Sequence, residues 1–138
     1  MRSKRGGCSN TCPVTGNDDL GTMSAWYLFS AIGLYPAMPG TGQVLLHPPR
    51  FERIAVDLGN GNTLRIQAPG AGSGPVRYIE GVAFDGAPSP HVWLDWSRLR
   101  TGGTLQYTLG ATPGTWGTAS VDLPPAACHF PPSRRTLE

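Results

Sequence analysis

Charged and hydrophobic residues are both scarce in this 138-residue chain, at 14% and 39% of the sequence. Average domains hold roughly 25% and 45–50%, so a helical bundle, a coiled coil and a charged disordered chain are all disfavoured. Glycine and proline are abundant instead, with 19 and 14 residues. This composition is typical of short strands joined by many turns, and the length suits one small domain with a modest core.

Long hydrophobic runs are also missing. The longest apolar stretch, residues 20–34, is interrupted by Gly, Thr and Ser and is shorter than the roughly 20 residues of a membrane span. The basic start is not followed by an apolar segment, so we predict no signal peptide in this chain.

A basic stripe is absent too. The formal charge of +2 comes from the two ends, and the central part carries six basic and eight acidic residues. We therefore expect neither nucleic acid nor membrane as a partner.

Cysteine and histidine are too few and too scattered to predict a structural zinc site. Cys8 and Cys12 have no matching second pair, because the third cysteine is Cys128. A Cys8–Cys12 disulfide is possible in an oxidising compartment, whereas free thiols in the chain ends are the simpler interpretation. No metal ligand is predicted.

The chain divides into four segments by composition, and no internal repeat is visible. Residues 1–15 are polar and basic, which predicts a disordered lead. Residues 16–43 predict a helix and a loop, and residues 44–117 an antiparallel β region. Residues 118–138 contain two Pro-Pro pairs, which predicts a disordered tail.

The helix begins after three capping side chains, Asn17, Asp18 and Asp19, and stops near Gly33. Its apolar residues cover nearly the whole circumference, so we expect it to be buried on most sides. These residues are Leu20, Met23, Trp26, Tyr27, Phe29, Ile32 and Leu34.

Alternating apolar residues predict strands in the β region. Residues 53–58 and 63–67 flank the sequence Gly-Asn-Gly-Asn, which predicts a hairpin. Further strands are expected over 78–84 and 105–109, and residues 91–100 predict an irregular strand and one helical turn. The expected fold class is α+β and mainly β: one buried N-terminal helix followed by an antiparallel, sandwich-like sheet region.

The candidate site is the sequence Gly16-Asn17-Asp18-Asp19-Leu20-Gly21. Adjacent carboxylates at a helix start are explained by capping and by the helix dipole. The same field keeps a carboxylate ionised, as a general base must be before it accepts a proton. The spacing alone leaves both interpretations open.

The run GNDDLGTMSAWYLFSAIGLYPAMPGTG resembles glycoside hydrolase family 92, the calcium-dependent exo-acting α-mannosidases. The resemblance continues through FERIAVDLGNGNTLRIQAPG, YIEGVAFDGAP and RTGGTLQYTLGATPGTWG, and covers about residues 16–117. It implies that the chain is the C-terminal fragment of a longer enzyme with a β-sandwich and an (α/α)6 barrel. Residues 16–43 would then be the end of that barrel.

The resemblance also implies a chemistry. Family members look like inverting glycosidases, in which an acid protonates the leaving oxygen and a base activates water. By position, Asp19 is the general base, and Asn17 and Asp18 are supporting polar groups. Calcium is the implied cofactor, with its ligands in this chain unknown. α-1,2-linked mannosides are the implied substrates, other substrate-binding residues are unknown, and the location is extracellular or periplasmic.

The general acid has no counterpart here. None of the glutamates, Glu52, Glu80 and Glu138, stands at the family's acid position. We therefore expect the chain alone to be inactive, with the missing upstream barrel and β-sandwich as its partners.

Two other interpretations remain open. One is a carbohydrate-binding β module, and the other is a remnant whose helix exposes an apolar face. A binding platform would use Trp93, Trp96, Trp116, Tyr78 and Tyr107, although aromatic residues in strands are more often core. His91 near Asp95 would suggest an acid–base pair, whereas an exposed histidine is the simpler interpretation.

Overall fold

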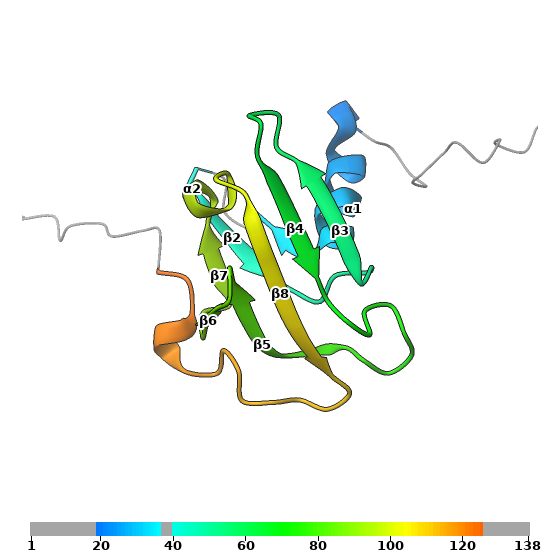
Figure 1. Ribbon diagram of the computed structural model, residues 1–138, viewed down its shortest axis with the longest axis vertical. Coiled ribbons are helices and arrows are strands. Elements are labelled where there is room, and N and C mark those ends of the chain that lie inside the picture. The colour runs from blue at the N-terminus through cyan, green and yellow to red at the C-terminus, as the bar shows by residue number, and fades with distance from the viewer. Residues whose placement is uncertain (1–18, 37–39, 126–138) are drawn as a thin grey trace, which may run out of the picture.

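The computed structural model describes residues 19–36 and 40–125 (Figure 1). The predictions made for residues 1–15, for Asn17 and Asp18, and for all three cysteines fall outside the described residues. The last residues of the expected tail, Glu138 included, fall outside them as well.

A five-stranded sheet contains most of the β region, in the order β3-β4-β8-β5-β6. Its strands are β3 (Arg53–Asp57), β4 (Thr63–Gln67), β5 (Tyr78–Phe84), β6 (Ala87–Ser89) and β8 (Gly103–Gly110). The predicted β3–β4 hairpin is confirmed, with Ile54 opposite Ile66 and Val56 opposite Leu64. Alternation places Leu64 and Ile66 in the core and leaves Arg65 and Gln67 exposed.

The expectation of a wholly antiparallel region is wrong at the centre of this sheet. β4 and β8 run parallel, with Leu64 opposite Gly103 and Ile66 opposite Leu105. Parallel neighbours need a long crossover, and here β5, β6, β7 and α2 supply it. Alternation shows that a segment is a strand, but it does not show in which direction the neighbouring strand runs.

A second sheet has three strands in the order β1-β2-β7. These are β1 (Leu34–Tyr35), β2 (Gln43–Leu46) and β7 (Trp93–Asp95), and α2 (Trp96–Leu99) follows β7 as the expected helical turn. Both sheets contribute to one core: Leu34, Val44 and Leu94 come from the smaller sheet, and Ile66 and Leu105 from the larger. The β region is therefore a two-layered, sandwich-like unit around a shared apolar core.

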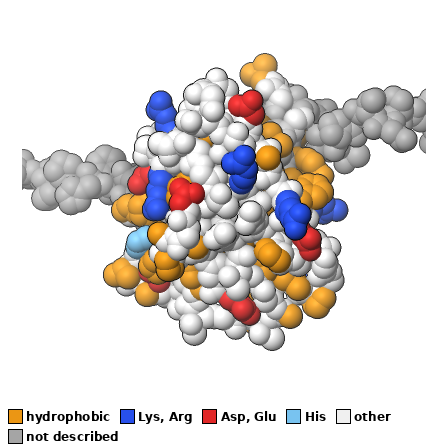
Figure 2. Space-filling model, viewed as in Figure 1, with side chains coloured by type: hydrophobic (Ala, Val, Ile, Leu, Met, Phe, Trp, Pro, Cys, Tyr) orange, Lys and Arg blue, Asp and Glu red, His pale blue; other side chains and the backbone are white. Residues whose placement is uncertain are grey.

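The outer face of the larger sheet is polar. Figure 2 shows mainly uncoloured side chains over its centre with scattered arginines, whereas hydrophobic side chains lie toward the margins and along the side where α1 lies. On this face Gln106 Nε2 lies 3.4 Å from Gln67 Oε1 on the adjacent strand.

Helix α1 (Thr22–Ile32) follows a single 3₁₀ turn, η1 (Asp19–Gly21). The prediction that this helix is buried on most sides is wrong within the described residues, since Ala31 is its only buried residue. The core is formed by side chains of the two sheets. Helix α1 contacts this core only through Phe29 and Ile32, in its last turns.

Packing continues past the β region. Residues 120–122 form a 3₁₀ turn, η2 (Ser120–Asp122), although they lie within the expected tail. The backbone N–H of Val92 donates to the carbonyl of Asp122 at 3.0 Å, and Asp122 is buried. Across the described ranges, no helix has the length and apolar character required to cross a bilayer.

Candidate functional site

The segment that carries the predicted base leads directly into α1. Asp19 begins η1, and Leu20 and Gly21 both have left-handed backbones, with φ of 56° and 79°. A left-handed leucine is uncommon, and such residues gather at functional sites, where the surrounding structure holds them in place. The side chain of Leu20 is fully exposed. The sharp turn therefore sets the direction in which the chain enters the helix.

The other end of α1 is anchored to the body by its backbone. Gly33 ends the helix in a left-handed conformation, with its N–H donating to the carbonyl of Phe29. The carbonyl of Gly33 accepts hydrogen bonds from the Tyr107 hydroxyl at 3.0 Å and from the His47 N–H at 3.1 Å. The N–H of Arg50 donates to the carbonyl of Ala31 at 2.9 Å. These contacts connect the helix to β8 and to the loop after β2.

Tyr107 belongs to the core and not to a sugar-binding surface. Tyr107 is 3% exposed, and its hydroxyl donates a hydrogen bond to the carbonyl of Gly33. Burial raises the pKa of this phenol far above its ordinary value, because the charged form would lose its hydration.

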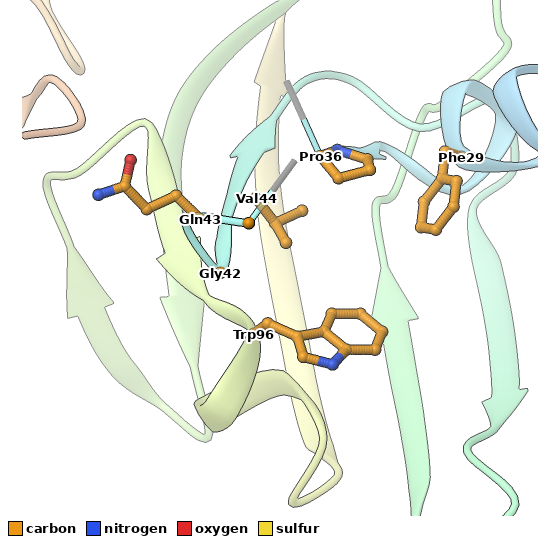
Figure 3. Close-up of a pocket in the computed structure, with 7 residues that line it drawn as sticks. Phe29, Pro36, Gly42, Gln43, Val44 and Trp96 are labelled. Carbon is orange, nitrogen blue, oxygen red and sulfur yellow. The ribbon is translucent and has the colours of Figure 1, made fainter. Parts of the chain in front are cut away.

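The other four aromatic residues do not join into one platform. Trp96 is exposed and lines a hollow of about 200 Å³ with Phe29, Pro36 and Val44 (Figure 3). Tyr78 and Trp116 line a different hollow, and the indole N–H of Trp116 donates to the carbonyl of Ser89 at 2.9 Å. Trp93 is half-buried beside His91, with ring centroids 5.8 Å apart. Of the two hollows that these aromatic residues line, the one beside Trp96 has the more apolar lining.

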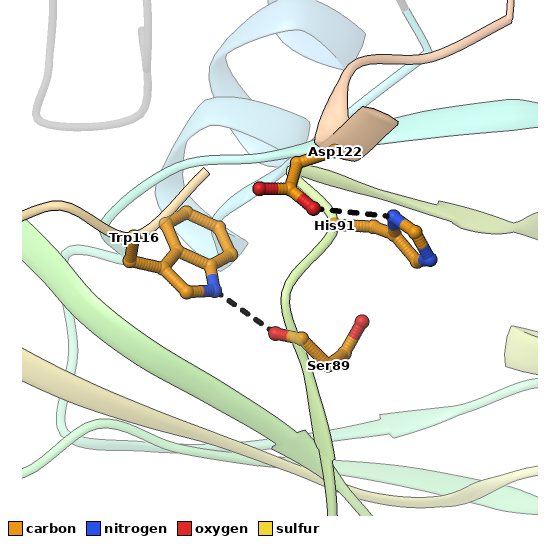
Figure 4. Close-up of polar contacts among 4 residues, drawn as sticks. All are labelled: Ser89, His91, Trp116 and Asp122. Carbon is orange, nitrogen blue, oxygen red and sulfur yellow. Dashed lines mark hydrogen bonds and ion pairs between the residues drawn. The ribbon is translucent and has the colours of Figure 1, made fainter. Parts of the chain in front are cut away.

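His91 contacts Asp122 and not Asp95. Its Nδ1 lies 3.9 Å from Oδ1 of Asp122, a distance typical of a weak ion pair and too long for a hydrogen bond (Figure 4). The contact joins the chain before β7 to η2. The histidine thus lies where the C-terminal end of the described chain returns to the body, and the suggested pairing with Asp95 is wrong.

Neither described glutamate has the setting of a general acid. Glu52 Oε1 accepts a hydrogen bond from the backbone N–H of Gly70 at 3.0 Å, which closes a loop at the sheet edge. Glu80 is exposed at the irregularity in β5 where the register shifts.

The described side chains do not form a calcium site. Within the described ranges there is no group of three or more His, Cys, Asp or Glu side chains that could surround a metal ion. Calcium takes six to eight oxygen ligands, so the described part of this chain does not by itself fit the implied cofactor.

Solved structures share this arrangement of helix and strands. A family 92 α-mannosidase from Bacteroides thetaiotaomicron superposes with a TM-score of 0.77 at 29% identity, over 83% of this chain and 15% of its own. An inverting mannosidase of the same family and species gives a TM-score of 0.68 at 29% identity, over 78% of this chain and 14% of its own. The first of these enzymes has also been solved with mannoimidazole.

Sequence comparison agrees. A secreted glycosidase of Arthroderma benhamiae, itself uncharacterized, is 32% identical over 118 residues, which are 84% of this chain and 15% of the relative. The sequence profile of the glycosyl hydrolase family 92 catalytic domain matches residues 9–111. The chain belongs to this family, and it spans about 15% of the length of the relatives it matches.

The family match overlaps the predicted segments at its N-terminal end. The family match begins at residue 9, inside the stretch expected to be a disordered lead, and it includes all of α1 and the predicted base. Sequence reasoning missed Tyr107 as the residue that joins the sheet to the helix. Its position in an alternating strand indicated burial but not its hydrogen-bond partner.

Proposed function

We propose that this chain is the part of a family 92 glycoside hydrolase that supplies the general base for cleavage of terminal α-mannosides. The observation that supports this most is the family match over residues 9–111, which contains the Gly-Asn-Asp-Asp sequence and the helix after it. The solved neighbours are named α-mannosidase and inverting mannosidase. At 29% identity, the similarity to them goes beyond a shared fold.

Asp19 is the proposed base. An inverting glycosidase needs one carboxylate to remove a proton from water on the face of the sugar opposite the leaving group. Asp19 opens the turn immediately before α1. Asn17 and Asp18 are proposed to orient that water or the base.

The general acid is proposed to belong to the part of the family-length enzyme that this chain does not span. Glu52 is held by a loop contact and Glu80 is exposed on β5. A base without an acid cannot assist departure of the leaving group, so the chain alone is proposed to be inactive. Calcium dependence and linkage preference are properties proposed for the whole enzyme.

The proposed location is extracellular or periplasmic. The support is the name of one relative, a secreted glycosidase. α-Mannoside glycans are the proposed substrates, in keeping with the mannoimidazole complex of the Bacteroides enzyme.

The test places residues 9–125, which contain the family match and η2, in a family-length chain, where they replace the corresponding segment of the Bacteroides α-mannosidase. Mannose release from an α-1,2-linked disaccharide is then measured with calcium present. Asp19→Asn is expected to lower kcat by about a thousandfold or more, because general-base assistance is worth about 10²–10⁴ and bound water also loses its orientation.

Asp95→Asn is the matched control. Asp95 is exposed and its side chain makes no helix-capping hydrogen bond, so this variant should keep full activity. Loss of activity in both variants, or in neither, would contradict the role of Asp19. Mannose release by the purified 138-residue chain alone would contradict its expected inactivity.

A further inference from the structure

The turn between β3 and β4 contains the one Asn-Gly pair of the sequence, Asn60-Gly61. Asparagine is thermolabile in proteins, because the backbone nitrogen of the next residue can attack its side-chain amide. Glycine favours this reaction, since it has no side chain to block the approach. Both residues are exposed, and a Cβ added at Gly61 would meet nothing within 4 Å. The space beside the attacking nitrogen is therefore open.

The amide of Asn60 is held at both of its polar atoms. Its Oδ1 accepts the backbone N–H of Asn62 at 3.0 Å, and its Nδ2 donates to the carbonyl of Arg100 at 2.9 Å. The first contact activates the amide, because the donor faces the oxygen that gains negative charge when a nucleophile adds to Cγ. The N–H of Gly61 donates to no group among the described residues. Its nitrogen is therefore available as the nucleophile.

We propose that Asn60 is a site of spontaneous modification, at which the side-chain amide is converted to an acid. The nitrogen of Gly61 forms a bond to Cγ of Asn60 and gives up its proton. The bond between Cγ and Nδ2 breaks, and Nδ2 leaves as ammonia. Water then opens the resulting cyclic imide at either carbonyl, which gives aspartate or isoaspartate. The reaction consumes only water, and the inference does not depend on the catalytic role of Asp19.

The modification removes a contact between two distant segments. The bond from Asn60 to Arg100 joins the β3–β4 turn to the residue that ends α2. Immediately after these segments β4 and β8 begin as parallel neighbours, with Leu64 opposite Gly103 (Figure 1). An ionised acid has only acceptors, so the bond to the Arg100 carbonyl is lost and two oxygens face each other. We therefore expect the modified chain to be less stable.

Peptide mapping is the first test. The full 138-residue chain is incubated for days at neutral and at mildly alkaline pH and is then cleaved with trypsin, which releases residues 54–65 as one peptide. The mass gain of deamidation should appear at Asn60, and its rate should rise with pH because the attacking nitrogen must give up a proton. Asn62 is the internal reference on the same peptide. It should stay unmodified, since the branched side chain of Thr63 in β4 adjoins the nitrogen that would attack.

Gly61→Ala tests the imide route. The added methyl group shields the attacking nitrogen, so the mass gain at Asn60 should be at least about tenfold slower than in the parent chain. Unfolding does not remove this methyl group, so the expected ratio also holds if the variant is less stable. A gain at the parent rate would contradict the route through Gly61.

Asn60→Asp tests the structural consequence, because it reproduces one of the two products. The matched control is Asn62→Asp, which places the same charge in the same turn. Nδ2 of Asn62 lies 3.5 Å from the Arg100 carbonyl, at the limit of a hydrogen bond. Thermal unfolding should show a Tm lower by a few degrees for Asn60→Asp and a smaller change for Asn62→Asp. Equal shifts would show that the charge and not the contact with Arg100 is responsible.

Two mapping results would overturn the proposed site. One is the absence of any mass gain at Asn60 in the incubated chain. The other is an equal gain at Asn60 and Asn62, which would show that the Asn60-Gly61 turn has no special reactivity. A gain at Asn60 that is independent of pH would contradict attack by the Gly61 nitrogen.

Discussion

At the scale of single residues, Tyr107 connects the larger sheet to helix α1. Tyr107 lies in the middle of β8, and its hydroxyl donates a hydrogen bond to the carbonyl of Gly33, the residue that ends α1. The same carbonyl also accepts the N–H of His47, so it keeps one partner when the phenol is removed. Because Tyr107 is buried, solvent does not reach the phenol hydroxyl to replace Gly33 as its partner.

Tyr107→Phe should therefore lower the free energy of unfolding by about 1 kcal/mol, the usual net value of one buried hydrogen bond. Tyr78→Phe is the control, because Tyr78 is 42% exposed and its hydroxyl is expected to remain hydrated. Denaturant titration measures both. An unchanged Tyr107→Phe variant would show that the hydroxyl makes no net contribution.

Alkaline pH tests the same residue from another direction. Burial raises the pKa of Tyr107 in the folded chain, whereas in the unfolded chain the phenol titrates near its ordinary value of about 10. The folded state therefore binds the proton more tightly. The resulting stability is fully present below pH 10 and is lost as the pH rises above 10, with a limiting slope of about 1.4 kcal/mol per pH unit. Tyr107→Phe should remove this slope, and an equal slope in both proteins would contradict the assignment.

At the scale of elements, the end of α1 shows how a turn positions a site. Gly33 has φ of +83°, and a Cβ added there would lie 2.7 Å from the carbonyl oxygen of His47. The helix can stop at this point and turn into β1 only because the residue has no side chain.

Gly33→Ala is expected to destabilise the chain by about 2 kcal/mol or more, and Gly61→Ala by about 1 kcal/mol. Gly61 has a similar φ of +81°, but an added Cβ there meets nothing within 4 Å. The comparison therefore separates the close contact with His47 from the cost of the backbone conformation. Equal losses in the two variants, measured by thermal or denaturant unfolding, would show that the contact relaxes at no cost.

At the scale of the whole molecule, the C-terminal end of the described chain is part of the fold. The Asp122 carbonyl accepts the Val92 N–H, and the Asp122 carboxylate lies near His91 (Figure 4). A chain that ends at residue 117 should therefore unfold several degrees below the full chain, while one that ends at residue 125 should match it. Circular dichroism melting compares the three lengths. Equal Tm values for all three lengths would show that residues 118–125 do not stabilise the fold.

Much of the β region was predictable because its signals are local. Alternating apolar residues marked β3, β4, β5 and β8 close to their observed bounds, and the glycine after the helix marked its end. The candidate base came from a resemblance in sequence, and its catalytic role stays a prediction because the side chain of Asp19 is not among those described. Asn17 and Asp18 lie outside the described residues and remain predictions too.

The sequence alone determined that β3, β4, β5 and β8 are strands, where α1 stops and which family the chain resembles, because periodicity, glycine and motif are properties of neighbouring residues. Only the tertiary structure decided that β4 and β8 run parallel, that Tyr107 holds the helix end, and that α1 leaves its first turns exposed. Each of these depends on a partner far away along the chain. The apolar circumference of α1 predicted burial on most sides, because such a pattern shows which residues are apolar and not which elements lie beside them.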